Sequence, residues 1–271
     1  MNDIVLSRKL ISKEAKFYHA INYADFGAYC SERSILSRQV LSSTYNEFTS
    51  FFSDELDKTL NVWNRIFGNL NDIGKYFWKY ERATPNAYGP ITIVLKKDIW
   101  SELSDITITT RTITSLDSKR ITDKNVDEIF EEFNGHYRLK LGFTATEVSV
   151  LNTKISFDNI AYILIDPMII NGLSLRQHVV NLLVEKNIYN NGITDRQVIE
   201  RTVYEQSQID RISKLIEWAR ILRGNLIIQN EPLEKSLPEN LKDWFKQLED
   251  WKKRIMASWL TYIYNGTISK L

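Results

Sequence analysis

Four β-prone segments in the middle of the chain limit the possible folds more than any other feature of the sequence. They are residues 91–95 (ITIVL), 106–110 (ITITT), 146–151 (TEVSVL) and 160–165 (IAYILI), and all are rich in branched or aromatic side chains. A fifth such segment, Phe17–Ile21, lies near the N-terminus. Segments with helical spacing of apolar residues lie on both sides of this group. The chain is therefore expected to be a mixed α and β protein.

The helical segments are recognised by apolar residues three or four positions apart and by capping residues at their ends. They are predicted at Asp25–Arg38, Glu55–Phe67, Thr122–Phe133, Leu175–Lys186, a long helix opened by Thr194–Gln197, and a last helix that begins at Pro238. In the last helix Trp244, Trp251 and Trp259 recur at helical spacing. Such a stripe is interpreted as buried core rather than as a platform for stacking bases, because a large apolar face must be buried.

Composition indicates a globular protein of 271 residues, with 43% hydrophobic and 25% charged residues. The net charge of +1 gives no support for nucleic-acid binding, and Lys96–Lys97 and Lys252–Arg254 are explained as solvated surface. No apolar run reaches about 20 residues, so no membrane span is expected. The N-terminus lacks the features of a secretory signal, and the single cysteine, Cys30, forms no disulfide within the chain. The expected location is the cytoplasm.

Several enzyme classes are excluded because their characteristic residues are missing. The sequence contains no phosphate-binding G-x-x-x-x-G-K-[ST] loop, no G-x-G-x-x-G and no G-x-S-x-G. The three histidines and one cysteine show no zinc-binding spacing, so no metal is expected. Arg176–His178 has the wrong spacing for an HEPN-type ribonuclease.

The order of several short segments resembles the ADP-ribosyltransferase fold, in particular DarT-like and CmdT-like toxins of toxin–antitoxin and phage-defence systems. The opening strand of that family carries a histidine, as Tyr18–Ile21 does here, and Ser34–Arg38 resembles the end of the next helix. Phe51–Asp54 resembles a strand–helix junction that carries a serine. Thr146–Val150, followed by Ile160–Ile163, resembles the segment that holds the catalytic glutamate. The match covers a little over half of the chain.

The resemblance implies an α+β fold with a split, mostly antiparallel ADP-ribosyltransferase-like core at residues 1–172 and a helical C-terminal extension packed on it at 173–271. It also implies that Glu147 is catalytic and stabilises the positive charge that develops on the ribose of NAD. The residues implied to bind NAD are Tyr18, His19, Ala20, Arg38 and Ser53, with Arg111 as the alternative arginine. The loop implied to present the target contains His136, Tyr137 and Arg138. One departure is Ala20–Ile21, where the family commonly has a small residue and threonine.

Each of these residues also has a plain structural explanation. His19 beside aromatic residues is typical of a hydrogen-bonded core histidine, and Glu147 on a strand is typical of the solvent-facing half of an alternation. Arg111 in a threonine-rich strand is typical of a solvated cross-strand partner. The order of the family's segments favours the functional interpretation of His19 and Glu147, and favours Arg38 and Arg111 much less.

The expected function is that of an NAD-dependent mono-ADP-ribosyltransferase toxin that modifies a nucleic-acid base in RNA or single-stranded DNA. The resemblance implies a cognate antitoxin as partner, with or without a chaperone. One alternative keeps the fold but makes a protein side chain the acceptor. Others are a non-enzymatic interaction protein that uses the aromatic helical tail, and a metal-independent nuclease.

Overall fold

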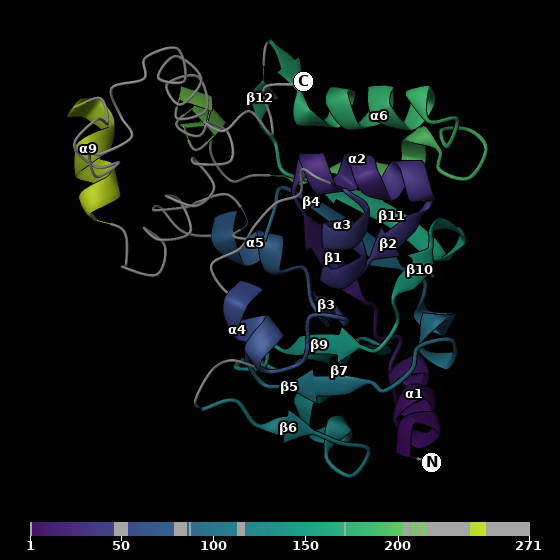
Figure 1. Ribbon diagram of the computed structural model, residues 1–271. Helices are drawn as coiled ribbons and strands as arrows, with labels where there is room; N and C mark the ends of the chain where they lie inside the picture. Colours follow the sequence, from purple (N-terminus) through teal and green to yellow (C-terminus); the bar gives the residue numbers. More distant parts are fainter. Residues whose placement is uncertain are drawn as a thin grey trace.

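The computed structural model describes residues 2–45, 54–78, 86, 88–112, 117–170, 172–202, 206–207, 209–210, 213–214 and 239–247. This part of the chain combines an eight-stranded sheet with helices, as Figure 1 shows, so the α+β prediction is confirmed. The helices are α1 (Asn2–Ser12), α2 (Tyr23–Glu32), α3 (Arg38–Thr44), α4 (Asp54–Thr59), α5 (Ile73–Trp78), α6 (Leu175–Glu185) and α9 (Glu239–Lys246). Short 3₁₀ helices are η1 (Lys97–Ser101), η2 (Val126–Ile129), η3 (Phe157–Asn159) and η4 (Asp195–Gln197).

The large sheet has the strand order β14-β11-β4-β1-β3-β9-β5-β6. Its strands are β1 (Tyr18–Ile21), β3 (Ile66–Asn69), β4 (Ile91–Leu95), β5 (Thr107–Thr109), β6 (Arg120–Ile121), β9 (Glu147–Val150), β11 (Ile160–Ile165) and β14 (Val198–Glu200). All neighbouring pairs are antiparallel except β11 and β14, which are parallel. The smaller sheets pair β2 (Ser34–Leu36) with β10 (Lys154–Ser156), β7 (Phe130–Phe133) with β8 (His136–Leu139), and β12 (Ile169–Ile170) with β13 (Leu173–Ser174).

The large sheet is split between β1 and β3. These strands share a single register pair, Tyr18 with Asn69, whereas β1 shares four pairs with β4 and β3 shares four with β9. We call β14, β11, β4 and β1 the first half of the sheet, and β3, β9, β5 and β6 the second half. The halves touch closely at Gly68, where an added Cβ would lie 2.6 Å from the carbonyl oxygen of Tyr18. The expected split, mostly antiparallel core is therefore present.

Helices cover the face of the sheet on which His19 lies. Because directly opposite residues point to the same face, His19 shares this face with Ile93 and Ile163, and both isoleucines are fully buried. Helix α2 packs here through Phe26 and Tyr29, and α6 packs on the far side of α2 (Figure 1). Thr92 and Tyr18 lie on the opposite, more polar face.

Three predicted helices differ from the structure. The helix predicted at Asp25–Arg38 ends at Glu32, because Arg33 adopts a left-handed conformation (φ 49°) and β2 pairs with β10. The helix predicted at Glu55–Phe67 ends at Thr59, and its C-terminal residues form β3 instead. The expected buried positions Leu56 and Leu60 are 44% and 46% exposed.

The helix predicted at Thr122–Phe133 is also wrong. It is a short 3₁₀ turn followed by the β7–β8 hairpin, whose connection, Asn134–Gly135, has positive φ at both residues. That dipeptide is the residue pair which a two-residue hairpin turn of this type favours. Strand pairing and the tight turn therefore determine the structure of this segment, despite its weak helical spacing.

The predicted C-terminal extension, which begins at residue 173, contacts the predicted core: α6 packs on α2, and β14 pairs with β11. Helix α6 agrees with the prediction, and the capping box at Thr194 and Gln197 is present. It opens a single 3₁₀ turn rather than a long helix, and β14 follows as an edge strand of the large sheet. The described part of this extension is therefore not wholly helical, and the division at 172/173 stays a prediction. The residues of the predicted apolar stripe, which are Ile212, Leu215, Ile216, Ala219 and Leu222, and the helix beyond Gln247 lie outside the described residues.

The described helices include none that is long and apolar enough to cross a membrane.

Candidate active site

Glu147 lies at the start of β9, in a row of residues that crosses the split in the sheet. It is directly opposite Asn69 of β3 on one side and Thr109 of β5 on the other, and Asn69 is opposite Tyr18 of β1. Opposite residues of neighbouring strands point to the same face, so Tyr18, Asn69 and Glu147 share the polar face. Strands lie 4.7–4.9 Å apart, which separates Tyr18 from Glu147 by about 10 Å. The structure thus brings together two residues that were predicted from distant segments.

Tyr88 is a residue near the candidate site that sequence reasoning missed. Its side chain is half-buried, and this burial raises the pKa of Tyr88, with a further contribution from the negative charge of Glu147. The ring stands edge-on to Phe77 of α5 at 6.5 Å between centroids, and the backbone N–H of Tyr88 donates to Oδ1 of Asn86 at 3.1 Å. The sequence signal for this segment is the proline- and glycine-rich break around it, which indicates a turn but not its position beside a carboxylate.

His19 lies on the opposite face from Tyr18 and is almost fully buried. Its Nδ1 is 2.6 Å from the carbonyl oxygen of Phe67, and its Nε2 is 3.2 Å from the hydroxyl of Tyr29, which donates to the carbonyl of Leu36 at 2.9 Å. A carbonyl only accepts, so Nδ1 carries the proton. Burial lowers the pKa of His19 to about 4; the hydrogen bond to Phe67 opposes this shift and the charge of Arg38 adds to it. His19 is therefore neutral at pH 7 and links β1 to β3 across the split.

Both ring nitrogens of His19 thus contact protein groups, and its predicted contact with a ribose stays a prediction. Both contacts are those of a hydrogen-bonded core histidine, which is the structural explanation that the sequence also allows. Ala20 is half-buried and lies on the face of Tyr18, because side chains alternate along a strand. Ser53 and the aromatic segment Phe48–Phe52 lie outside the described residues.

Of the two candidate arginines, Arg38 is the one near His19. It is the first residue of α3, its Nη1 donates to Oδ2 of Asp25 at 3.4 Å, and its guanidinium lies 5.4 Å from the ring centroid of Trp63. Arg111 is exposed and forms an ion pair with Asp117. The geometry therefore favours Arg38 over Arg111 as a residue of the His19 side of the site.

The residues predicted to present the target form a strand rather than a loop. His136, Tyr137 and Arg138 all lie in β8 and are exposed, and residues 140–146 connect this strand to Glu147. Arg138 is held by an ion pair with Glu131, with Nε 2.7 Å from Oε1. Lys13, just after α1, lies 3.9 Å from the ring centroid of Tyr137.

A cavity of about 610 Å³ separates this hairpin from β1, and Tyr18, Tyr137 and Arg138 all line it. Five basic side chains and one acidic side chain lie in its wall, which gives a formal charge of +4. They are Lys13, Lys16, Lys96, Lys97, Arg138 and Glu14.

Two of these lysines direct their charge at neutral oxygens. Lys16 Nζ is 3.4 Å from the hydroxyl of Tyr162, and Lys96 Nζ donates to the carbonyl of Asp158 at 2.7 Å. Glu147 is not in the wall of the cavity, but Tyr18 of the same row is, and Leu70 of the wall donates its backbone N–H to the carbonyl of Thr146 at 3.3 Å. The cavity is therefore rich in basic side chains, partly aromatic and close to the row that contains Glu147, although Lys13, Lys97 and Arg138 are paired with Asp127, Glu14 and Glu131.

The described residues contain no cluster of three histidine, cysteine, aspartate or glutamate side chains that could hold a metal ion.

Comparison with known proteins finds likeness among solved structures. The chain is similar to Thermosipho africanus DarTG in complex with ADP-ribose (13% identity, TM-score 0.43), over 66% of this chain and 49% of that chain, so it spans about half of that protein's length. It is similar to Thermus sp. 2.9 DarT in complex with ADP-ribosylated ssDNA (8% identity, TM-score 0.45, 69% and 94% covered). The likeness to the same DarT in complex with NAD+ is 8% identity and TM-score 0.43, with 70% and 96% covered.

No protein-family model and no curated protein matches this chain. The fold is therefore defined by the strand order and by the split between β1 and β3, independently of these relatives.

Proposed function

We propose that the protein is an NAD-dependent mono-ADP-ribosyltransferase that modifies a nucleic-acid base. The row of Tyr18, Asn69 and Glu147 across the split sheet carries the proposal. It joins the two segments on which the sequence resemblance depends, although they lie far apart in the chain. A resemblance in short segments alone does not require this juxtaposition.

The chemistry needs a carboxylate near the reacting ribose. Cleavage of the nicotinamide–ribose bond leaves positive charge on the ribose, and a nearby carboxylate stabilises that charge in the transition state. Nicotinamide leaves with the electron pair of the broken bond, the acceptor atom forms the new bond to the ribose carbon, and the acceptor loses its proton. Glu147 is the residue that we assign to this stabilising role. Tyr18, in the same row, supplies an aromatic surface.

The lysine-rich cavity close to the row of Glu147 supports a nucleic-acid acceptor rather than a protein side chain. Lysine side chains attract phosphates, and aromatic side chains such as Tyr137 stack on unpaired bases. The net charge of the whole chain is only +1, so this positive charge is a local feature of the cavity. The proposal includes a role in a toxin–antitoxin or phage-defence system, with a cognate antitoxin as partner.

Transfer of label from NAD tests the reaction. Purified protein is incubated with NAD labelled in its adenylate phosphate and with single-stranded DNA, RNA or cell protein. We expect label on nucleic acid, and a loss of about 10³-fold or more with Glu147→Gln, which removes the stabilising charge. Glu185→Gln, an exposed carboxylate of α6, is the matched control and should transfer label at the wild-type rate. Label transfer that survives Glu147→Gln would reject the assignment.

The acceptor class is tested separately. Label on the product should be sensitive to nuclease and resistant to protease; the opposite result would favour the protein-acceptor alternative. Lys16→Ala combined with Lys96→Ala should weaken binding of a single strand and reduce the slope of log K against log salt by about 1.4, since each lost phosphate contact removes about 0.7. Lys58→Ala, on α4, is the matched control and should leave that slope unchanged.

A further inference from the structure

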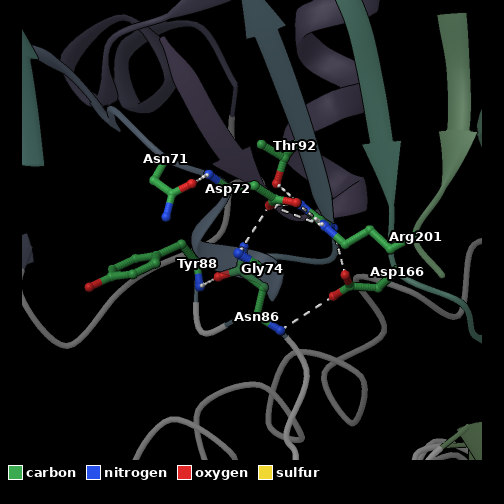
Figure 2. Close-up of polar contacts among 8 residues, drawn as sticks. All are labelled: Asn71, Asp72, Gly74, Asn86, Tyr88, Thr92, Asp166 and Arg201. Carbon is green, nitrogen blue, oxygen red and sulfur yellow. Dashed lines mark hydrogen bonds and ion pairs between the residues drawn. The ribbon is translucent and has the colours of Figure 1, made fainter. Parts of the chain in front are cut away.

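Arg201 is a buried arginine at the edge of the candidate site that the proposed chemistry does not use. It follows β14, and its side chain is 2% exposed. Two nitrogens of the guanidinium donate hydrogen bonds to Asp72: Nη2 lies 2.7 Å from Oδ1, and Nε lies 3.1 Å from Oδ2. Nη1 donates to Oδ1 of Asp166 at 2.5 Å, and Nη2 also donates to Thr92 Oγ1 at 2.6 Å. Figure 2 shows these partners converging on Arg201 from separate segments.

The partners of Arg201 belong to both halves of the split sheet. Thr92 lies in β4 and Asp166 directly follows β11, both in the first half. Asp72 lies just beyond β3 of the second half, and its Oδ1 accepts the backbone N–H of Gly74 at the start of α5. A single guanidinium thus connects the two halves at one end of the sheet.

Asp166 also accepts a hydrogen bond from the segment that contains Asn86 and Tyr88. Its Oδ2 accepts the backbone N–H of Asn86 at 3.3 Å (Figure 2). Asn86 is fully buried; its Oδ1 accepts the N–H of Tyr88 at 3.1 Å, and its carbonyl accepts the N–H of Gly89 at 3.0 Å. Asn86, Tyr88 and Gly89 are therefore anchored to Asp166, and the charge of Glu147 contributes to the raised pKa of Tyr88.

We propose that Arg201 is a positioning residue which, through Asp166 and Asn86, holds Tyr88 against Phe77 of α5 at the edge of the candidate site, and so sets the geometry of that site. The link from Arg201 to Tyr88 stands on the contacts alone. Its consequence for turnover rests on the proposed function.

Asp166→Asn separates the two roles of Asp166. The asparagine keeps one oxygen for Arg201 but replaces the other with an N–H₂ group, which cannot accept from Asn86. Asp105→Asn is the matched control, because Asp105 pairs with the other buried arginine of the sheet, Arg65, with Nη1 2.6 Å from Oδ2. Asp105 has φ 45°, a conformation that asparagine tolerates.

Hydrogen exchange tests the link without any activity. In Asp166→Asn we expect the amides of Asn86, Tyr88 and Gly89 to exchange about tenfold faster or more, because the anchoring bond is lost. Asp105→Asn should leave them at the wild-type rate. Exchange of these three amides that stays within about twofold of wild type in Asp166→Asn would overturn the proposed link.

A double-mutant cycle tests the consequence for turnover. NAD consumption is measured for wild type, Asp166→Asn, Tyr88→Ala and the double variant, at a temperature where all are folded. We expect Asp166→Asn to lower kcat about 10- to 100-fold with little change in KM, and to cause no further loss when Tyr88 is already alanine. Losses that multiply, as for independent sites, would overturn the positioning role. Absence of NAD consumption in wild type would reject the proposed function, and hydrogen exchange would then decide the link alone.

Discussion

The two halves of the split sheet each contain a buried arginine on the polar face, and the two arginines are used differently. Arg65 precedes β3 and donates to Ser149 of β9, to Thr107 of β5 and to Asp105, all within the second half. Arg201 binds Asp72 beyond β3 as well as Asp166 and Thr92 of the first half. One arginine stabilises a half, whereas the other connects the halves.

The burial of the carboxylate partners predicts that the two connections differ in energy. Asp72 and Asp166, the partners of Arg201, are 6% and 0% exposed, while Asp105, the partner of Arg65, is 52% exposed. Burial opposes the charge of Arg201, but the charge of Asp166 and the bonds to Asp72 outweigh it and raise the pKa of Arg201 above its usual value. Removing the partner of a solvated carboxylate costs little free energy, because water stabilises its charge. Removing the partner of two buried carboxylates leaves uncompensated charges and costs more.

The first prediction compares the two arginines directly. Arg201→Met should lower the free energy of unfolding by about 3–5 kcal/mol, because two buried carboxylates lose their guanidinium partner. Arg65→Met should cost about 1–2 kcal/mol, since Asp105 is hydrated and mainly hydrogen bonds are lost. Urea denaturation at pH 7 measures both values. Equal losses would contradict the distinction between the two arginines.

The second prediction concerns His19, the other link between the halves. Its pKa is about 4 when folded and 6.5 as the ordinary value, so the unfolded state binds more protons between these pH values. The stabilising effect of keeping His19 neutral is complete above about pH 6.5 and falls by about 3 kcal/mol as the pH drops to about 4.

Urea denaturation at pH 7 and pH 4.5 measures this dependence. His19→Gln has no group that titrates in the window, so its stability should fall less than that of wild type over the same range. His136→Gln, at an exposed position of β8, is the control and should behave as wild type. A variant at His19 with the full wild-type dependence would show that other groups cause it.

The third prediction concerns the point where the halves touch. Gly68→Ala should destabilise the protein by about 1–3 kcal/mol, because the new Cβ would meet the carbonyl of Tyr18 at 2.6 Å and the ring of Phe17 at 2.7 Å. Gly27→Ala, inside α2 with open space around it, should instead stabilise by about 0.4–1 kcal/mol. Thermal unfolding compares the two variants. A neutral Gly68→Ala would mean that the halves can move apart without cost.

Local sequence was sufficient for the strands whose own residues favour them. β4 and β11 are apolar, branched segments, and α6 has regular helical spacing, so all three were predicted correctly. β3 was not, because Ile66–Asn69 includes glycine and asparagine and follows a segment with helical spacing. Its pairing with β9 makes it a strand. The β7–β8 hairpin was missed although Asn134–Gly135 is a strong local signal for a hairpin turn.

Some residues of the candidate site could likewise be predicted from the sequence, and others could not. Glu147 could be selected from the sequence because its segment resembles that of a known family and its strand is regular. Tyr88 and Asn69 could not, because nothing in their own segments indicates a carboxylate neighbour. Of the residues that the resemblance implied, Tyr18, Tyr137 and Arg138 come together at the cavity, whereas His19 and Arg38 lie on the other face of the sheet.

The sequence by itself determined the α+β class of the protein and led to Glu147 as the proposed reactive group, because strand propensity, helical spacing and short segments are properties of neighbouring residues. Only the tertiary structure decided where the sheet splits and what bridges the split. Arg201 meets Asp72, Thr92 and Asp166 across 129, 109 and 35 residues of chain. A buried charge is stabilised by the opposite charges that the fold places beside it. These partners are distant in the chain, so local sequence patterns do not predict the contact.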